Sequence, residues 1–232
     1  MSTPVDVLVF GPHPDDIEIG LGGTVAKQVK LGRTVALCDL TRGELGTNGT
    51  EAVRLAEAQA GAAALGVSMR ENLEWPDGAI GGSQQIKEAA EFIRRHRPST
   101  VVIPYWADRH PDHVAASDVL TTAVFRSGLR KFTAAGDAWR PDWICYYFIN
   151  DAVPPSFVVD VSEYYGVKRR ALNCHRSQFT PEGQDSAPTR LTSPRFHQLI
   201  ESRDAGFGAA VGVAFAEGFV VREPVLRTDV MK

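Results

Sequence analysis

Two short stretches rich in histidine and aspartate contain the side chains of this sequence that could do chemistry. The first reads HPDD over residues 13–16, and the second reads DRHPDH over residues 108–113. Together they supply six candidates: His13, Asp15, Asp16, His110, Asp112 and His113. Two histidines and one carboxylate are the minimal protein ligands of a catalytic Zn²⁺, and they leave a fourth position for water. Such a metal lowers the pKa of its water to about 7 and polarises a carbonyl group.

The spacing within each stretch predicts a division of roles. Adjacent side chains diverge, so Asp15 and Asp16 are not expected to bind the same ion. One of them is predicted to bind the metal and the other to act on the water as a general base. Asp112 stands next to two histidines, which predicts that it orients one imidazole and holds it cationic. The alternative for the first stretch is a tight turn with a helix cap, which Pro14 and the acidic pair would also suit.

Each stretch follows an apolar run of strand length, at residues 5–10 and 100–104. Further strand-like and helical runs alternate between them, at 24–31, 34–40, 51–65, 72–75 and 83–97. This alternation predicts a Rossmann-like, doubly wound α/β fold, a three-layer sandwich whose mostly parallel sheet carries helices on both faces. In the strand order 3-2-1-4-5, the first and fourth strands are neighbours at the switch point. The two stretches are therefore expected to meet in one crevice at the carboxyl edge of the sheet.

The remainder of the chain predicts further elements of the same fold: helices at 114–125, 162–176 and 195–203, strands at 143–149 and 157–161, and a strand-like tail. Residues 180–194 are polar and rich in Gly, Pro and Ser, which predicts a mobile loop able to cover the site. No repeat or linker separates a second unit, so residues 1–232 are expected to form a single domain.

The composition excludes several classes of protein. With 44% hydrophobic and 23% charged residues the chain can bury a sizeable core, and its net charge of −3 indicates neither a nucleic-acid nor a membrane partner. It has no run of 18 apolar residues and no signal-peptide pattern, so we expect a soluble, cytoplasmic protein. Gly20, Gly22 and Gly23 miss the G-x-G-x-x-G spacing of a dinucleotide site and are expected to allow close packing of the first helix. The three widely spaced cysteines are given no role.

The two stretches, together with LTRGELGTNGT at 40–50, resemble the LmbE/PIG-L family of zinc-dependent N-acetylglucosaminide deacetylases. Within that family the chain is most similar to the bacillithiol biosynthesis deacetylases. The similarity extends over nearly the whole chain and includes SGLRKF, SQF and AEGF at 127–132, 177–179 and 216–219. The resemblance implies hydrolysis of the acetyl group of an N-acetylglucosaminyl conjugate, N-acetylglucosaminyl malate in particular. It also implies one Zn²⁺ per chain, with Fe²⁺ or another divalent metal as the alternative.

The resemblance also assigns roles to single residues. It implies three zinc ligands: His13, Asp16 and His113. Asp15 becomes the base that deprotonates the water, and His110 the cation that stabilises the oxyanion and protonates the leaving amine, with Asp112 behind it. Four positions are implied to contact the substrate: Glu44, Arg54, Asp77 and Arg109. Arg54 is expected to open towards the cleft and offer a planar fork to the malate carboxylates.

Two further implications concern the rest of the family pattern. Some relatives carry a tyrosine near the start of the last helix, where this chain has Phe196, so any hydroxyl that assists catalysis there is expected to be absent. Relatives assemble as oligomers, often hexamers, which implies a homo-oligomer acting on a small sugar conjugate.

Two functions of other classes fit the same side chains. A set of two histidines and one carboxylate also holds Fe(II) in oxygenases, although nothing in the sequence resembles a cosubstrate site. A non-catalytic metal-binding domain is the other alternative, and the presence of both Asp15 and His110 argues against it, because binding alone requires neither.

Overall fold

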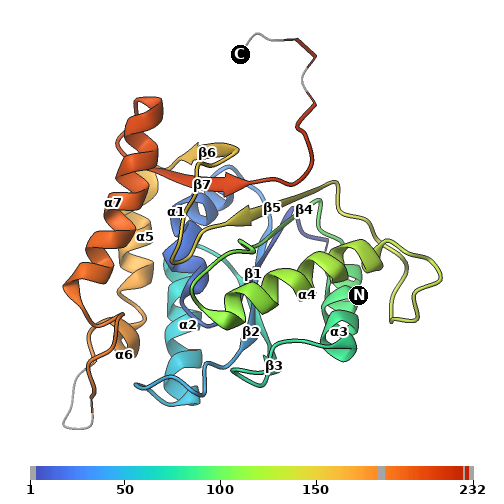
Figure 1. Ribbon diagram of the computed structural model, residues 1–232, viewed down its shortest axis with the longest axis horizontal. Coiled ribbons are helices and arrows are strands. Elements are labelled where there is room, and N and C mark those ends of the chain that lie inside the picture. Colours follow the sequence, from blue (N-terminus) through green and yellow to red (C-terminus); the bar gives the residue numbers. More distant parts are fainter. Residues whose placement is uncertain (1–3, 182–185, 227, 230–232) are drawn as a thin grey trace.

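The computed structural model describes residues 4–181, 186–226 and 228–229. Its strands are β1 (Val7–Gly11), β2 (Val35–Thr41), β3 (Met69–Trp75), β4 (Thr100–Pro104), β5 (Trp143–Tyr147), β6 (Phe157–Asp160) and β7 (Ala216–Val220). They form one seven-stranded sheet in the order β3-β2-β1-β4-β5-β7-β6 (Figure 1). The first five strands are parallel, and β7 runs antiparallel to both β5 and β6. The predicted mostly parallel sheet and its order 3-2-1-4-5 are confirmed, with β7 and β6 added at one edge.

Helices cover both faces of this sheet. They are α1 (Asp16–Lys30), α2 (Glu51–Leu65), α3 (Ser83–His96), α4 (Pro111–Ser127), α5 (Tyr165–Leu172), α6 (Arg176–Phe179) and α7 (Pro194–Val211), with a 3₁₀ turn at Ser162–Tyr164. Helices α1, α2, α5 and α7 pack on one face, and α3 and α4 pack on the other (Figure 1). The three-layer α/β sandwich is thus confirmed. None of the helices within the described residues has the length and apolar character that a membrane span needs.

Strand β1 shows why a strand at the centre of this sheet can be a continuous apolar run. Val7 and Val9 belong to the core beneath α1 and α2, whereas Leu8 and Phe10 belong to the core beneath α3 and α4. Successive side chains of a strand point to opposite faces, and both faces of this sheet are covered. In β1 no polar residue interrupts the apolar run before the strand ends, which places the first histidine and aspartates at its carboxyl edge.

The first helix begins earlier than predicted, at Asp16 rather than near residue 24. Gly20, Gly22 and Gly23 lie inside α1, where the helix packs closely against neighbouring elements. A Cβ atom at Gly20 would overlap the ring of Tyr147, and a Cβ at Gly23 would lie 2.8 Å from Val161 Cβ. The expectation that these glycines allow close packing is confirmed, and that packing overrides their low helix propensity.

Helix α1 is also kinked, at Leu21, and the kink is stabilised by a buried carboxylate. Gly23 and Thr24 donate their backbone N–H groups to Glu217 at 2.9 and 2.6 Å. The Nζ of the fully buried Lys168 donates to the same carboxylate at 2.7 Å. Because free N–H groups in a buried helix must find acceptors, Glu217 ties α1 to β7 and α5. This fixes the helix whose first turn carries Asp16.

Candidate active site

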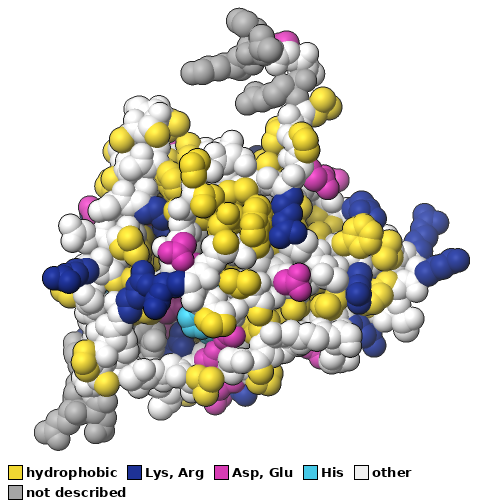
Figure 2. Space-filling model, in the orientation of Figure 1, with side chains coloured by type: hydrophobic (Ala, Val, Ile, Leu, Met, Phe, Trp, Pro, Cys, Tyr) yellow, Lys and Arg dark blue, Asp and Glu magenta, His cyan; other side chains and the backbone are white. Residues whose placement is uncertain are grey.

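The two histidine- and aspartate-rich stretches meet at the carboxyl edge of the sheet, as predicted. Strands β1 and β4 are parallel neighbours, with Val7 opposite Thr100 and Val9 opposite Val102. Helices α1 and α4 begin just beyond the ends of these strands. Both stretches line one cleft with a volume of about 460 Å³. Figure 2 shows histidine atoms exposed on this face beside acidic and basic side chains.

Three side chains in the cleft direct donor atoms at one point. His13 Nδ1 lies 3.0 Å from Oδ2 of Asp16, and His113 Nε2 lies 3.3 Å from the same oxygen. All three donor atoms lie within 4.8 Å of one another, and all three residues are buried. One imidazole follows the end of β1 and the other follows the end of β4, so the two meet because these strands are neighbours in the sheet.

The outer nitrogen of each imidazole faces a carboxylate. His13 Nε2 donates to Asp77 Oδ1 at 3.0 Å and lies 3.3 Å from Asp112 Oδ2, and His113 Nδ1 donates to Asp108 Oδ1 at 3.1 Å. We assign the protons to these outer nitrogens from the hydrogen-bond network, which directs both inner lone pairs at the shared carboxylate oxygen. Three converging lone pairs repel unless a cation lies among them. The donor set therefore fits a divalent metal ion.

The pKa values of the two histidines also indicate that this cluster of donor atoms favours positive charge. Burial disfavours a charged imidazole, yet the carboxylates of Asp16 and Asp108 raise the pKa of His113 to about 9. The pKa of His13 is likewise raised well above its usual value, against burial, by hydrogen bonds that include the one with Asp112. A bound metal ion would replace the extra proton that each imidazole carries in its charged form, since ligating imidazoles are neutral.

Asp77 links one of these histidines to the loop at residues 41–50. Its Oδ2 accepts the N–H of Leu45 at 3.0 Å, and its own N–H donates to Glu44 Oε1 at 2.8 Å. Asp77 lines the cleft, but Glu44 is not among the lining residues. Glu44 and Asp77 thus both bond the protein, and Asp77, which lines the cleft, also orients His13.

Replacing Asp77 with asparagine is expected to weaken metal binding by about 10–100-fold, the usual effect of losing a carboxylate that orients a ligating histidine. The affinity is measured by competition with a chromophoric chelator. Glu44→Gln is the matched control, because it keeps an acceptor for the Asp77 N–H and contacts no histidine. Equal affinity of Asp77→Asn and the unaltered protein would contradict this role.

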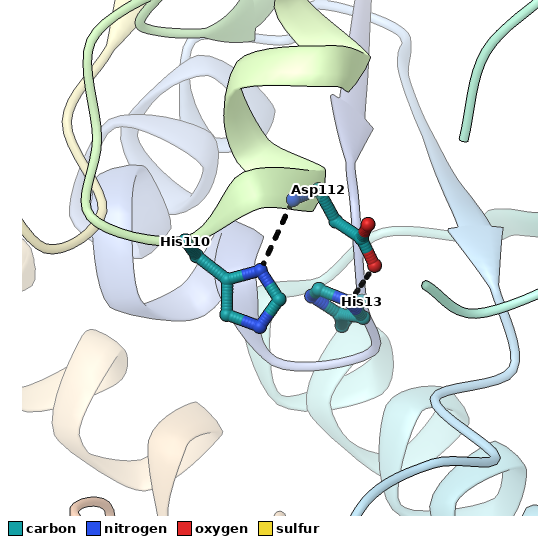
Figure 3. A group of neighbouring side chains, drawn as sticks. All are labelled: His13, His110 and Asp112. Carbon is teal, nitrogen blue, oxygen red and sulfur yellow. Dashed lines mark hydrogen bonds and ion pairs between the residues drawn. The ribbon is translucent and has the colours of Figure 1, made fainter. Parts of the chain in front are cut away.

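His110 caps α4. Its ring contacts the backbone N–H of Asp112 and not the Asp112 carboxylate, which was expected to lie behind it. Its Nδ1 accepts the backbone N–H of Asp112 at 3.2 Å, so the ring carries its proton on Nε2. The Asp112 carboxylate points to His13 instead (Figure 3) and also accepts the N–H of Gly78 at 2.9 Å. Burial and the neighbouring His113 and His13 lower the pKa of His110. A helix N-terminus also disfavours a cation, so the expected imidazolium is replaced by a neutral donor.

His13, His110 and Asp112 form a second group whose donor atoms lie within 4.8 Å of one another (Figure 3). Two of these donors already have partners in the protein. The lone pair of His110 Nδ1 faces a backbone N–H, and the Asp112 carboxylate bonds a second backbone N–H and His13. Asp16 Oδ2 also accepts a backbone N–H, that of His13 at 2.9 Å, but all three residues of its group are buried, whereas His110 is not, so the group with Asp16 and His113 is the better metal site.

Asp15 lies beside the donor cluster without belonging to it. It is buried, lines the cleft and adopts a φ of 142°, a conformation that non-glycine residues rarely hold. Its Oδ2 lies 3.6 Å from Nη2 of Arg54. Burial raises the pKa of Asp15 to about 6, although Arg54 opposes the shift. Asp15 thus lies outside the groups of converging donor atoms, and its pKa is raised towards neutral pH.

Arg54 lines the cleft, as expected, but it is only 4% exposed and its guanidinium is held by the protein itself. Its Nη1 donates to the carbonyl of Gly43 at 2.7 Å and its Nη2 to that of Pro14 at 3.1 Å. A side chain at Gly43 would overlap the guanidinium. Arg54 thus ties the loop at residues 41–50 to the stretch that carries Asp15. Removing one member of a buried ion pair typically costs about 3–5 kcal/mol, so substituting Arg54 would report stability rather than substrate choice.

Three residues that contribute to the site have no role in the sequence analysis. Asp108 opens the second stretch and binds His113, and Asn150 donates to Asp108 and lies 3.4 Å from His113 Nδ1. The signal for Asn150 is its place just beyond β5, the strand next to β4. His175 does not line the cleft, but its charge lowers the pKa of Asp15; it is buried with its Nε2 3.3 Å from Glu18, and no local pattern indicates it.

The mouth of the cleft has both polar and apolar lining. Arg109 is exposed there and makes no hydrogen bond or ion pair within the described residues. Phe196 is buried and lines the cleft, so no hydroxyl stands at this position. Thr189 and Leu191 also line it, which brings part of the predicted covering loop to the site. Residues 182–185 of that loop lie outside the described residues.

Comparison with known proteins agrees with this geometry. Residues 8–124 match the family described as PIG-L, GlcNAc-PI de-N-acetylase. Diacetylchitobiose deacetylase of Thermococcus kodakarensis is 34% identical over 91% of this chain and 83% of its own length. The 1D-myo-inositol 2-acetamido-2-deoxy-alpha-D-glucopyranoside deacetylase of Actinosynnema mirum is 27% identical over 88% and 95%. The crystal structure of the conserved protein TT1542 from Thermus thermophilus superposes with a TM-score of 0.89 and 37% identity, covering 98% of this chain and 99% of that one. The family match spans both stretches that build the site, and this chain therefore belongs to the PIG-L family.

Proposed function

We propose that this protein is a zinc-dependent hydrolase that removes the acetyl group from an N-acetylglucosaminyl conjugate. The observation that carries the proposal is the convergence of His13 Nδ1, Asp16 Oδ2 and His113 Nε2 in a cleft that Asp15 also lines. Three protein ligands leave room for water and substrate, which is typical of catalytic rather than structural zinc. The family match and the deacetylase relatives support amide hydrolysis as the reaction.

The protein's own residues would divide the work as follows. A bound divalent ion polarises the amide carbonyl and acidifies a water molecule. Asp15 accepts the proton of the attacking water and can return it to the leaving nitrogen. His110 donates a hydrogen bond from Nε2 to the carbonyl oxygen as that oxygen gains negative charge. A neutral imidazole fulfils this role, because it needs only the proton that the Asp112 backbone N–H directs to Nε2.

The proposal for the substrate rests on what the relatives share and on one exposed cation. The names of both deacetylases describe N-acetylated glucosamine joined to different groups, which supports recognition of the N-acetylglucosaminyl part. We propose malate as the group attached to it here. Arg109 lines the cleft, is exposed and is unpaired within the described residues, so its planar guanidinium can donate two hydrogen bonds to a carboxylate. We therefore assign to Arg109 the binding of the malate carboxylates, the role that the sequence suggested for Arg54.

The experiment is a panel of N-acetylglucosaminyl malate, N-acetylglucosaminyl inositol and N,N′-diacetylchitobiose, with loss of acetyl followed by mass spectrometry. Arg109→Ala is expected to lower kcat/KM on the malate conjugate roughly 10–100-fold, the equivalent of one charged hydrogen bond, and to change the neutral substrates little. Arg109→Lys is the matched control and retains the charge. An equal loss on all three substrates would place Arg109 against the sugar. Absence of hydrolysis of every substrate would refute the proposed function.

A further inference from the structure

We propose that an apolar wall of the cleft, formed by Ile19, Ile149, Leu191 and Phe196, binds the methyl group of the substrate and restricts the enzyme to acetyl amides. This inference rests on the proposed function, and it assigns the acyl specificity that the family match leaves open.

The wall is the point at which a hydrophobic core reaches the cleft. Ile19, Ile149 and Phe196 are 2–3% exposed and belong to one core cluster, and the half-buried Leu191 packs against it. Their side chains come from α1, the segment just beyond β5, the start of α7 and the loop before α7. No two of these four residues are neighbours in the sequence, so it is the tertiary structure that brings their side chains together.

The wall approaches the metal-binding cluster from one side. Ile19 lies one helical turn after Asp16, so both side chains share a face of α1. Ile149 precedes Asn150, whose amide lies 3.4 Å from His113 Nδ1. Ile19 and Ile149 thus stand on the segments that carry Asp16 and contact His113, and all four residues line the cleft.

The polar lining approaches from the side of His13. Asp77 and Asp112 contact its Nε2, and the Gly78 N–H bonds to Asp112. Leu45 lines the cleft in the loop that Asp77 holds. An acetamide carries a methyl group and a sugar nitrogen on its carbonyl carbon. The sugar hydroxyls need hydrogen-bond partners, so the sugar belongs on the polar side and the methyl group against the wall.

The wall is held rigidly from behind. Arg203 donates from Nη2 to the carbonyl of Ile19 at 2.7 Å and from Nη1 to that of Ile149 at 2.9 Å. Its Nε pairs with the fully buried Asp204 at 3.0 Å, and Lys168 donates to Asp204 at 2.7 Å. This buried network fixes the backbone of both isoleucines, so the wall does not retreat easily to admit a longer acyl chain.

The test compares kcat/KM of the zinc-loaded enzyme for the N-acetyl, N-propionyl and N-butyryl forms of one glucosaminyl conjugate. Leu191→Ala is expected to raise the butyryl-to-acetyl ratio by about 10-fold or more, since one methylene in an apolar pocket is worth roughly 10–200-fold in discrimination. Ile149→Val, which removes a single methyl group, is expected to shift the propionyl-to-acetyl ratio in the same direction. Leu45→Ala is the matched control: Leu45 is 71% exposed and lines the polar side, so the acyl ratio should stay unchanged.

The outcomes separate this inference from the function on which it rests. If the unaltered enzyme hydrolyses the acetyl conjugate but Leu191→Ala and Ile149→Val leave the acyl ratios unchanged, the wall does not select the acyl group. If Leu45→Ala shifts the ratio as much as Leu191→Ala, the acyl group lies on the polar side and the inference is overturned. If no acyl conjugate is hydrolysed at all, the proposed function and this inference fail together. Thermal unfolding of each variant verifies that it is folded.

Discussion

Dialysis against a strong chelator is expected to abolish hydrolysis, and one equivalent of Zn²⁺ per chain is expected to restore it. The reason is that the three converging donors of His13, Asp16 and His113 are the metal site of the proposed mechanism. Metal content is measured by elemental analysis and activity by release of acetate. Full activity in a rigorously metal-free sample would contradict the mechanism.

Loss of the metal should leave the fold largely intact, which distinguishes this site from that of a zinc finger. The ligands stand at the strand ends and helix starts of an α/β core that carries apolar clusters on both faces of its sheet. Far-ultraviolet circular dichroism should therefore be unchanged after chelation, with at most a lower Tm. His113→Ala is the control that should not regain activity with added Zn²⁺.

Asp15→Asn is expected to reduce kcat by roughly 10²–10⁴-fold, the usual contribution of a general acid–base group, while retaining the metal. Asp15 lies outside the donor cluster, so an amide in its place removes the proton acceptor without removing a ligand. Asparagine is also the suitable replacement because it has nearly the same shape as aspartate, so it disturbs this position, with its φ of 142°, the least.

Asp16→Ala provides the comparison, since it deletes the carboxylate that both imidazoles face. This variant should lose metal affinity and, with it, activity. Elemental analysis and kcat/KM are measured on both variants. An empty site in Asp15→Asn together with a loaded site in Asp16→Ala would show that the two roles are reversed.

The sequence predicted the fold and the location of the site because both depend on local patterns. The apolar run that ends at Phe10 indicates a strand buried on both faces, and a strand of that kind must end where polar side chains begin. The cap of α2 is equally local: Thr50 accepts the N–H of Val53 at 3.3 Å, as its sequence position predicts. Alternating strands and helices then place β1 beside β4, so the two stretches had to meet.

Only the tertiary structure decided the partners of each polar side chain within that site. Arg54 is buried because the loop at residues 41–50 folds over it and supplies carbonyl acceptors, which its place on α2 does not reveal. Asp112 turns to His13 rather than to its neighbour His110 because the helix start uses the His110 ring as an acceptor. Asn150 reaches His113 only because β5 lies next to β4. Residue types and spacing determine which chemistry a chain can perform. The direction of each side chain depends on elements packed from distant parts of the sequence, and that information is absent from any local pattern.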